Sequence, residues 1–60
     1  MPRDTFYTVS ILTETGWEIS RTFERKAPAQ KWARWCQQRW AAVIHRGGPG
    51  GERVADFPKA

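Results

Sequence analysis

The chain has 60 residues, of which ten are basic and six acidic, and its formal net charge is +4. This length allows one small domain. A single cysteine, Cys36, excludes an internal disulfide, and Cys36 and His45 alone are too few soft ligands for a zinc site, so no metal or other cofactor is expected. No secretory signal and no apolar run of roughly 20 residues is found, which favours a soluble cytoplasmic protein without a membrane partner.

Two strands are predicted near the start of the chain. Residues 6–13 and 17–24 both alternate between apolar and polar side chains, as half-buried strands do. The connection Glu14-Thr15-Gly16 is short, and its glycine can supply the positive φ of a tight turn. The pattern therefore predicts a β-hairpin. Its apolar face is expected to carry Tyr7, Val9, Ile11, Trp17, Ile19 and Phe23.

A helix is predicted to cover that apolar face, because a lone hairpin is barely stable in water. Pro28 suits the first helical turn, helix-forming residues continue to Arg46, and Gly47-Gly48 would end the helix. Cys36 is expected to be a buried structural thiol, whereas His45 falls on the solvated side. The stripe facing the sheet would contain Ala29, Trp32, Ala33, Cys36, Trp40, Val43 and Ile44.

The glycine-rich segment 47–51 has the composition of a flexible linker. Residues 52–60 fit a short strand and an unstructured tail equally well. The predicted fold class is therefore α+β, a small antiparallel hairpin packed against one α-helix, in the order ββα, or ββαβ if the last segment pairs. The domain is expected to span residues 1–46, with residues 47–60 as linker and tail or third strand.

The sequence contains no recognisable catalytic group. His45 has no nucleophile or carboxylate placed beside it by the pattern, and Glu18 and Glu24 would lie roughly 20 Å apart along a strand. That separation is too large for the paired carboxylates of a glycosidase. The GGPGG segment lacks the Lys-Ser/Thr of a P-loop. We therefore expect a protein that is not an enzyme and has no small-molecule substrate.

Charge is distributed unevenly along the chain. From Arg25 to Gly51 there are six basic residues and no acidic one, whereas the remainder holds four basic and six acidic residues. Segregated positive charge attracts polyanions, with nucleic acid first and an anionic membrane surface second. A solvated basic surface without a partner is the alternative.

The segment WARWCQQRW holds three of the four tryptophans. Trp32 and Trp40 fall on the apolar stripe, so we expect both in the core. Trp35 lies roughly 120° from the centre of that stripe, and it either covers the edge of the core or forms an exposed contact. Arg39 lies between Trp35 and Trp32 around the wheel, where its guanidinium can stack on an indole ring and still meet a phosphate.

One stretch of the chain carries a family-like pattern. It runs from Ser20-Arg21-Thr22-Phe23 at a strand end, through Arg25-Lys26-Ala27 in a turn, to Ala29-Gln30-Lys31-Trp32-Ala33 in a helix. In order and spacing, the stretch from Trp17 to Trp35 resembles the arm-type, AP2-like DNA-binding module at the N-terminus of phage integrases. The resemblance implies a sheet laid in the DNA major groove with the helix packed behind it.

The predicted outer face of the hairpin does not suit that binding mode. It would carry Thr8, Ser10, Glu18, Ser20, Thr22 and Glu24. Two carboxylates and no basic side chain on this face would repel phosphates. We therefore expect nucleic acid, DNA in preference to RNA, to contact the basic turn and helix. The candidate residues are Arg25, Lys26, Lys31, Arg34 and Arg39, with Trp35 as a stacking platform.

Two functions fit these features. The first is a small basic nucleic-acid-binding accessory protein, of the kind used by phages and mobile elements, that contacts DNA phosphates through its basic turn and helix. The second is a protein-interaction module, either a modulator of a host factor or a homodimerising domain. Tryptophan and arginine dominate interface hot spots, a polar sheet face can pair with a further strand, and very small domains often rely on self-association.

Overall fold

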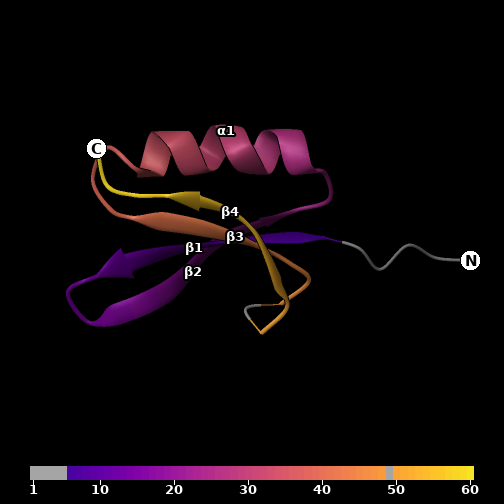
Figure 1. The fold of residues 1–60 in the computed structure, drawn as a ribbon, viewed down its shortest axis with the longest axis horizontal. Coiled ribbons are helices and arrows are strands. Elements are labelled where there is room, and N and C mark those ends of the chain that lie inside the picture. Colours follow the sequence, from indigo (N-terminus) through magenta and orange to yellow (C-terminus); the bar gives the residue numbers. More distant parts are fainter. Residues whose placement is uncertain (1–5, 49) are drawn as a thin grey trace, which may run out of the picture.

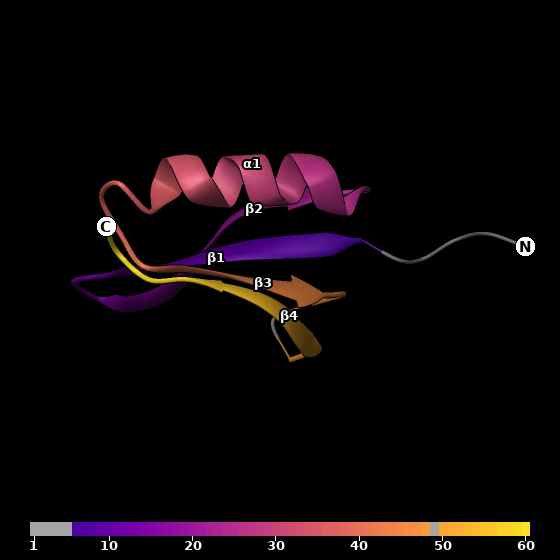
Figure 2. The same cartoon turned by 45° about the horizontal axis from the view of Figure 1, so that its top comes forward.

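The computed structural model describes residues 6–48 and 50–60. Its elements, in chain order, are β1 (Tyr7–Thr13), β2 (Gly16–Phe23), α1 (Lys26–Cys36), β3 (Ala42–Arg46) and β4 (Glu52–Phe57). The strands form one antiparallel sheet in the order β2-β1-β3-β4, and α1 lies across one face of it (Figures 1 and 2). The predicted α+β class with a hairpin and one helix is confirmed, and two further strands follow the helix.

The hairpin forms where it was predicted. Thr13 pairs with Gly16 across the turn, and Gly16 has a φ of +116°, a conformation that favours glycine. The Thr13 hydroxyl lies 3.0 Å from both the Gly16 carbonyl oxygen and the Glu18 carboxylate, and the Thr15 hydroxyl lies 2.9 Å from the same carboxylate. These side chains add local hydrogen bonds to the tight turn.

The helix is shorter than predicted, since it ends at Cys36 instead of continuing to Arg46. The backbone N–H groups of Arg39 and Trp40 both donate to the Cys36 carbonyl at 2.9 Å, which closes a turn that redirects the chain into β3. β3 contains the β-branched residues Val43 and Ile44, which favour strands. On a helical wheel, both positions also continue the apolar stripe of the predicted helix. Pairing with β1 on one side and β4 on the other outweighs the helical pattern.

The glycine-rich segment connects β3 to β4. Gly47 adopts a φ of +80°, and its N–H donates to the Phe6 carbonyl at 2.7 Å. A Cβ on Gly51 would overlap the carbonyl oxygen of Arg46, so this position requires glycine. Residues 52–57 form strand β4, and the following residues return to the end of α1, where the side chain of Gln37 donates to the Pro58 carbonyl at 2.9 Å.

The core lies between α1 and the central strands. The buried helix residues are small, which lets the helix approach the sheet closely. The residues that form the core are Val9, Ile11, Ala29, Ala33, Cys36, Ala42 and Ile44. Trp32 and Trp40, both predicted in the core, are partly buried and pack against its edge.

A β-bulge changes which side chains of β2 face the helix. Val9 pairs with Arg21 and Ser10 pairs with Ile19, so Ser20 is an extra residue between two ladder positions. An inserted residue reverses the alternation of the strand. Ile19 and Trp17, predicted on the apolar face under the helix, therefore lie on the opposite face, where they are 57% and 53% exposed.

The bulge also changes the place of Ser20, which was predicted on the outer face. Its hydroxyl oxygen accepts a hydrogen bond of 3.0 Å from Nε1 of Trp32, so it points toward the helix. Glu18, predicted on the same outer face, pairs with Ile11, whose side chain belongs to the core under α1. The outer face of the hairpin is thus more apolar and less acidic than the regular alternation predicts.

Cys36 is buried as predicted, with 1% of its surface exposed. Burial raises the pKa of the Cys36 thiol, and a hydrogen bond with Ser20 lowers it by a smaller amount. The neutral thiol is therefore favoured in the folded protein. Because the folded pKa is the higher one, this contribution to stability is complete below the unfolded pKa and is lost as the pH rises through the folded pKa.

We expect the hydrogen bond between Ser20 and Trp32 to stabilise the bulge. Ser20→Ala leaves a partly buried indole N–H without its acceptor and should lower the free energy of unfolding in urea by about 1–3 kcal/mol. Thr22→Ala, on the same strand and exposed, is the matched control and should cost less. In a cycle with Trp32→Phe, the double variant should lose less than the sum of the two single changes. Purely additive losses would contradict the bond.

We expect the Cys36 thiol to react slowly with an aromatic disulfide reagent in the folded protein at mildly alkaline pH. The rate should rise toward that of a free thiol as urea unfolds the chain, because burial both shields the sulfur and disfavours the thiolate. A Thr22→Cys variant in a Cys36→Ser background supplies an exposed thiol as the control. Equal rates for the two folded proteins would show that Cys36 is accessible.

Candidate nucleic-acid interface

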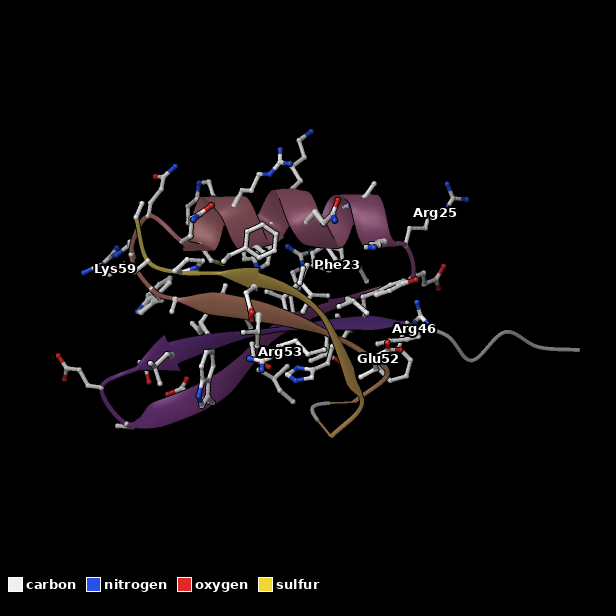
Figure 3. All side chains as sticks on the ribbon, in the orientation of Figure 1. Phe23, Arg25, Arg46, Glu52, Arg53 and Lys59 are labelled. Carbon is white, nitrogen blue, oxygen red and sulfur yellow. The ribbon has the colours of Figure 1, made fainter. Side chains whose placement is uncertain are left out.

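The predicted site residues lie on α1 and on its two flanking turns. Arg25 occupies the N-cap position with an extended backbone, and Lys26 is the first helical residue. Arg39 lies in the turn that follows the helix. The side chains of all six candidates are exposed, namely Arg25, Lys26, Lys31, Arg34, Trp35 and Arg39. Figure 3 shows Arg25 at the start of the helix, on the far side of the molecule from Lys59.

The helix carries positive charge without local compensation. Its first turn contains no acidic residue, and the N-cap residue Arg25 makes no side-chain capping hydrogen bond. Within residues 6–48 and 50–60, ion pairs join Arg46 to Glu52 at 3.5 Å and Arg53 to Asp56 at 3.3 Å, and neither involves a residue of α1. Basic side chains next to the electropositive N-terminus of a helix favour a nearby anion. Glu24 is the acidic neighbour of this turn in the sequence.

Trp35 both covers another ring and remains exposed. Its ring is stacked on that of Trp32 at a centroid distance of 5.2 Å and an interplanar angle of 19°, yet 55% of Trp35 is exposed. Trp32 is held from the strand side by the Ser20 hydrogen bond and by the Arg21 guanidinium, which lies 5.2 Å from the ring centroid. The stack therefore presents one indole to solvent on a support fixed by β2.

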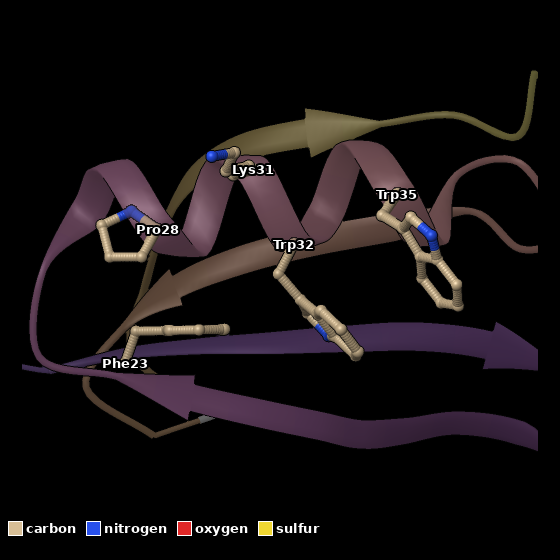
Figure 4. A pocket seen from close by; sticks show the side chains of 5 residues that line it. All are labelled: Phe23, Pro28, Lys31, Trp32 and Trp35. Carbon is tan, nitrogen blue, oxygen red and sulfur yellow. The ribbon is translucent and has the colours of Figure 1, made fainter.

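An apolar groove runs between α1 and β2 beside this stack. It has a volume of about 340 Å³ and is lined by Phe23, Pro28, Lys31, Trp32 and Trp35. Figure 4 shows Phe23 and Pro28 at one end, Trp35 at the other, and the Trp32 ring between them. The Arg21 guanidinium lies 5.6 Å from the centroid of Phe23 as well. Rings with cationic side chains beside them suit a planar, anionic ligand such as a nucleotide.

Arg39 stacks on a different ring from those predicted. Its guanidinium lies 5.3 Å from the centroid of Trp40, and no stacking with Trp32 or Trp35 is found in the described residues. The helical wheel assumed that the helix continues through this position, but α1 has already ended at Cys36. Sequence reasoning assigned no role to Arg21, although regular alternation already places it on the same face of β2 as Phe23.

The face of the sheet opposite α1 is the second notable surface. Leu12, Trp17 and Ile19 are exposed on it, at 43%, 53% and 57%. His45, predicted on the solvated side of a helix, is instead half-buried in β3. In the described part of the chain its Nδ1 is buried without a hydrogen-bond partner.

Among the described residues, no group of three or more His, Cys, Asp or Glu side chains could hold a metal ion. No helix in the same part of the chain is long and apolar enough to cross a membrane. The chain matches no protein-family model, no curated protein and no solved structure. The resemblance to the integrase module and the cytoplasmic location therefore stay predictions.

Proposed function

We propose that the protein is a small accessory protein that binds nucleic acid through α1 and its flanking turns. The supporting observation is the Trp35–Trp32 stack, in which an indole that is 55% exposed lies on a helix with no acidic residue. Lys31 lies one helical turn before Trp35 on the same face of the helix, and Arg34 precedes Trp35 in the sequence; both are exposed. This arrangement offers a base a stacking surface and its phosphates a positive charge.

The basic side chains contribute the part of the affinity that depends on salt. Lys26, Lys31 and Arg34 are spaced along the helix, and Arg25 and Arg39 extend the positive charge beyond its two ends. Phosphate contacts release counterions, so affinity falls as salt rises. The resemblance to a phage integrase module supports DNA in preference to RNA. The proposal includes no catalytic step, no cofactor and no small-molecule substrate.

Trp35 contributes the part of the affinity that depends on the bases. Its ring is held against Trp32, so little ordering is needed when a base stacks on the free indole surface. Stacking needs a base that is not covered by its neighbours, as in a single strand or at a strand end. We therefore choose a short single-stranded oligodeoxynucleotide, of a length that one copy of the protein can occupy, as the probe.

Charge on the helix can be tested with a single substitution. Arg34→Gln should weaken binding of the labelled oligonucleotide and lower the slope of log affinity against log salt by about 0.7, the value of one lost phosphate contact. Arg53→Gln removes the same charge from β4 and should leave both quantities unchanged. Fluorescence anisotropy at several salt concentrations measures them. Affinity that does not change with salt, or equal effects of the two variants, would refute the phosphate contact.

Stacking of a base on Trp35 can be tested in the same assay. Trp35→Ala should weaken binding by about 1–3 kcal/mol, the usual contribution of one stacked base. Trp17→Ala is the matched control, because Trp17 is 53% exposed but lies on the opposite face of the sheet. An oligonucleotide with an abasic position should bind the wild type more weakly and lose less on Trp35→Ala. If Trp17→Ala weakens binding more than Trp35→Ala, the oligonucleotide binds the opposite face of the sheet and the proposed interface on α1 is wrong.

A further inference from the structure

The outer sheet face, opposite α1, has a ridge with two grooves beside it. The ridge is Trp17, which stands more than half exposed on β2. One groove, of about 330 Å³, is lined by Ser10, Trp17, Val43, His45 and Arg53. The other, of about 310 Å³, is lined by Trp17, Val43, Arg53 and Asp56, and it reaches the edge of the sheet at Ala42 and Phe57, which belong to the core or pack against it. A ridge beside a groove is the shape that two copies related by a two-fold axis can exchange.

Apolar side chains surround this ridge. Leu12 pairs with Trp17 and Ile19 pairs with Ser10, so both lie on the same face of the sheet as Trp17. Leu12 and Ile19 are 43% and 57% exposed. Three exposed large apolar residues on one face of a chain this small mark an interaction surface.

Charge indicates what can occupy this surface. Within residues 6–48 and 50–60, Arg53 and Asp56 on the outer sheet face pair at 3.3 Å and cancel, and His45 beside Arg53 is the other titratable side chain there. On the helix side, in the described part of the chain, positive charge is instead found without an ion-pair partner. Two copies would repel one another through their helices but not through their sheets. A face on which Arg53 and Asp56 cancel suits another copy of the same chain better than it suits a polyanion.

We propose that the outer sheet face binds a second copy of this chain in a two-fold symmetric dimer. Trp17 of each copy enters the groove beside Val43 on the other, and Ile19 and Leu12 are covered around it. Each Arg53 can pair with the partner's Asp56 as well as with its own. This inference does not rest on the proposed nucleic-acid binding, which uses the opposite side of the molecule.

A dimer contact of ordinary size would need a broad part of this face. The molecule exposes 4358 Å² in total. A standard interface removes about 800 Å² from each partner, so a second copy must cover most of one face instead of a single corner. The outer sheet face extends over all four strands and is not covered by α1 (Figure 2). Dimerisation through it would leave two basic helices on opposite outer sides of the assembly.

Sedimentation equilibrium over a protein concentration series, at low and moderate salt, tests the proposal. The wild type should give twice the mass of the chain. Because the contact is mainly apolar, added salt should not raise the dissociation constant of the dimer. Ile19→Glu places like charges in the interface and should raise the dissociation constant about tenfold or more. Trp35→Ala, an aromatic truncation on the helix side, should leave it unchanged.

Circular dichroism and thermal unfolding check that each variant folds. If Ile19→Glu does not fold, Ile19→Thr replaces it, because threonine keeps the β-branched shape that suits a strand. A wild type that has the mass of one chain at every concentration would overturn the proposal. A dimer that Trp35→Ala breaks, or one that neither Ile19 variant weakens, would overturn it as well, since the contact would then lie on another surface.

Discussion

The extra residue in β2, Ser20, determines how the rest of the molecule is arranged. Val9 pairs with Arg21 and Ser10 with Ile19, and the intervening Ser20 turns its hydroxyl toward α1 and accepts the Trp32 indole N–H at 3.0 Å. The bulge therefore has two effects. It gives the indole N–H of Trp32 a hydrogen-bond acceptor, and it reverses which side chains of β2 face the helix. The helix-facing aromatic cluster and the apolar outer sheet face both follow from it.

The bulge separates the tryptophans into groups with different surroundings. Trp32 is fixed from β2, and Trp35 stacks on it at 5.2 Å and faces solvent. Trp17 emerges on the opposite face of the sheet, next to the neutral pair of Arg53 and Asp56. The proposed nucleic-acid interface and the proposed dimer contact thus use opposite sides of one small domain. Positive charge is concentrated on the first side, which is why polyanion binding and self-association need not compete.

Local sequence signals predicted the parts of the fold that local interactions decide. Alternation and the positive φ available to Gly16 indicated the hairpin, and Pro28 indicated the first helical turn. The end of the helix was predicted ten residues too late, at Arg46 instead of Cys36. Val43 and Ile44 fit the apolar stripe of a helix and a buried strand equally well. Only pairing with β1 and β4 distinguishes the two. The side of the sheet that Trp17 faces depends on one unpaired residue, so alternation alone predicted it wrongly.

The faces of β2 are best tested by nuclear Overhauser effects from the ring of Trp17. The structure places this ring beside Val43 and Arg53 on the outer sheet face. Cross-peaks from Trp17 to the Val43 methyl groups, together with cross-peaks between the indole N–H of Trp32 and the Ser20 Hβ atoms, would confirm the bulge. Cross-peaks from Trp17 to the buried helix residues Ala29 and Ala33 would contradict it, and would place Trp17 in the core under α1.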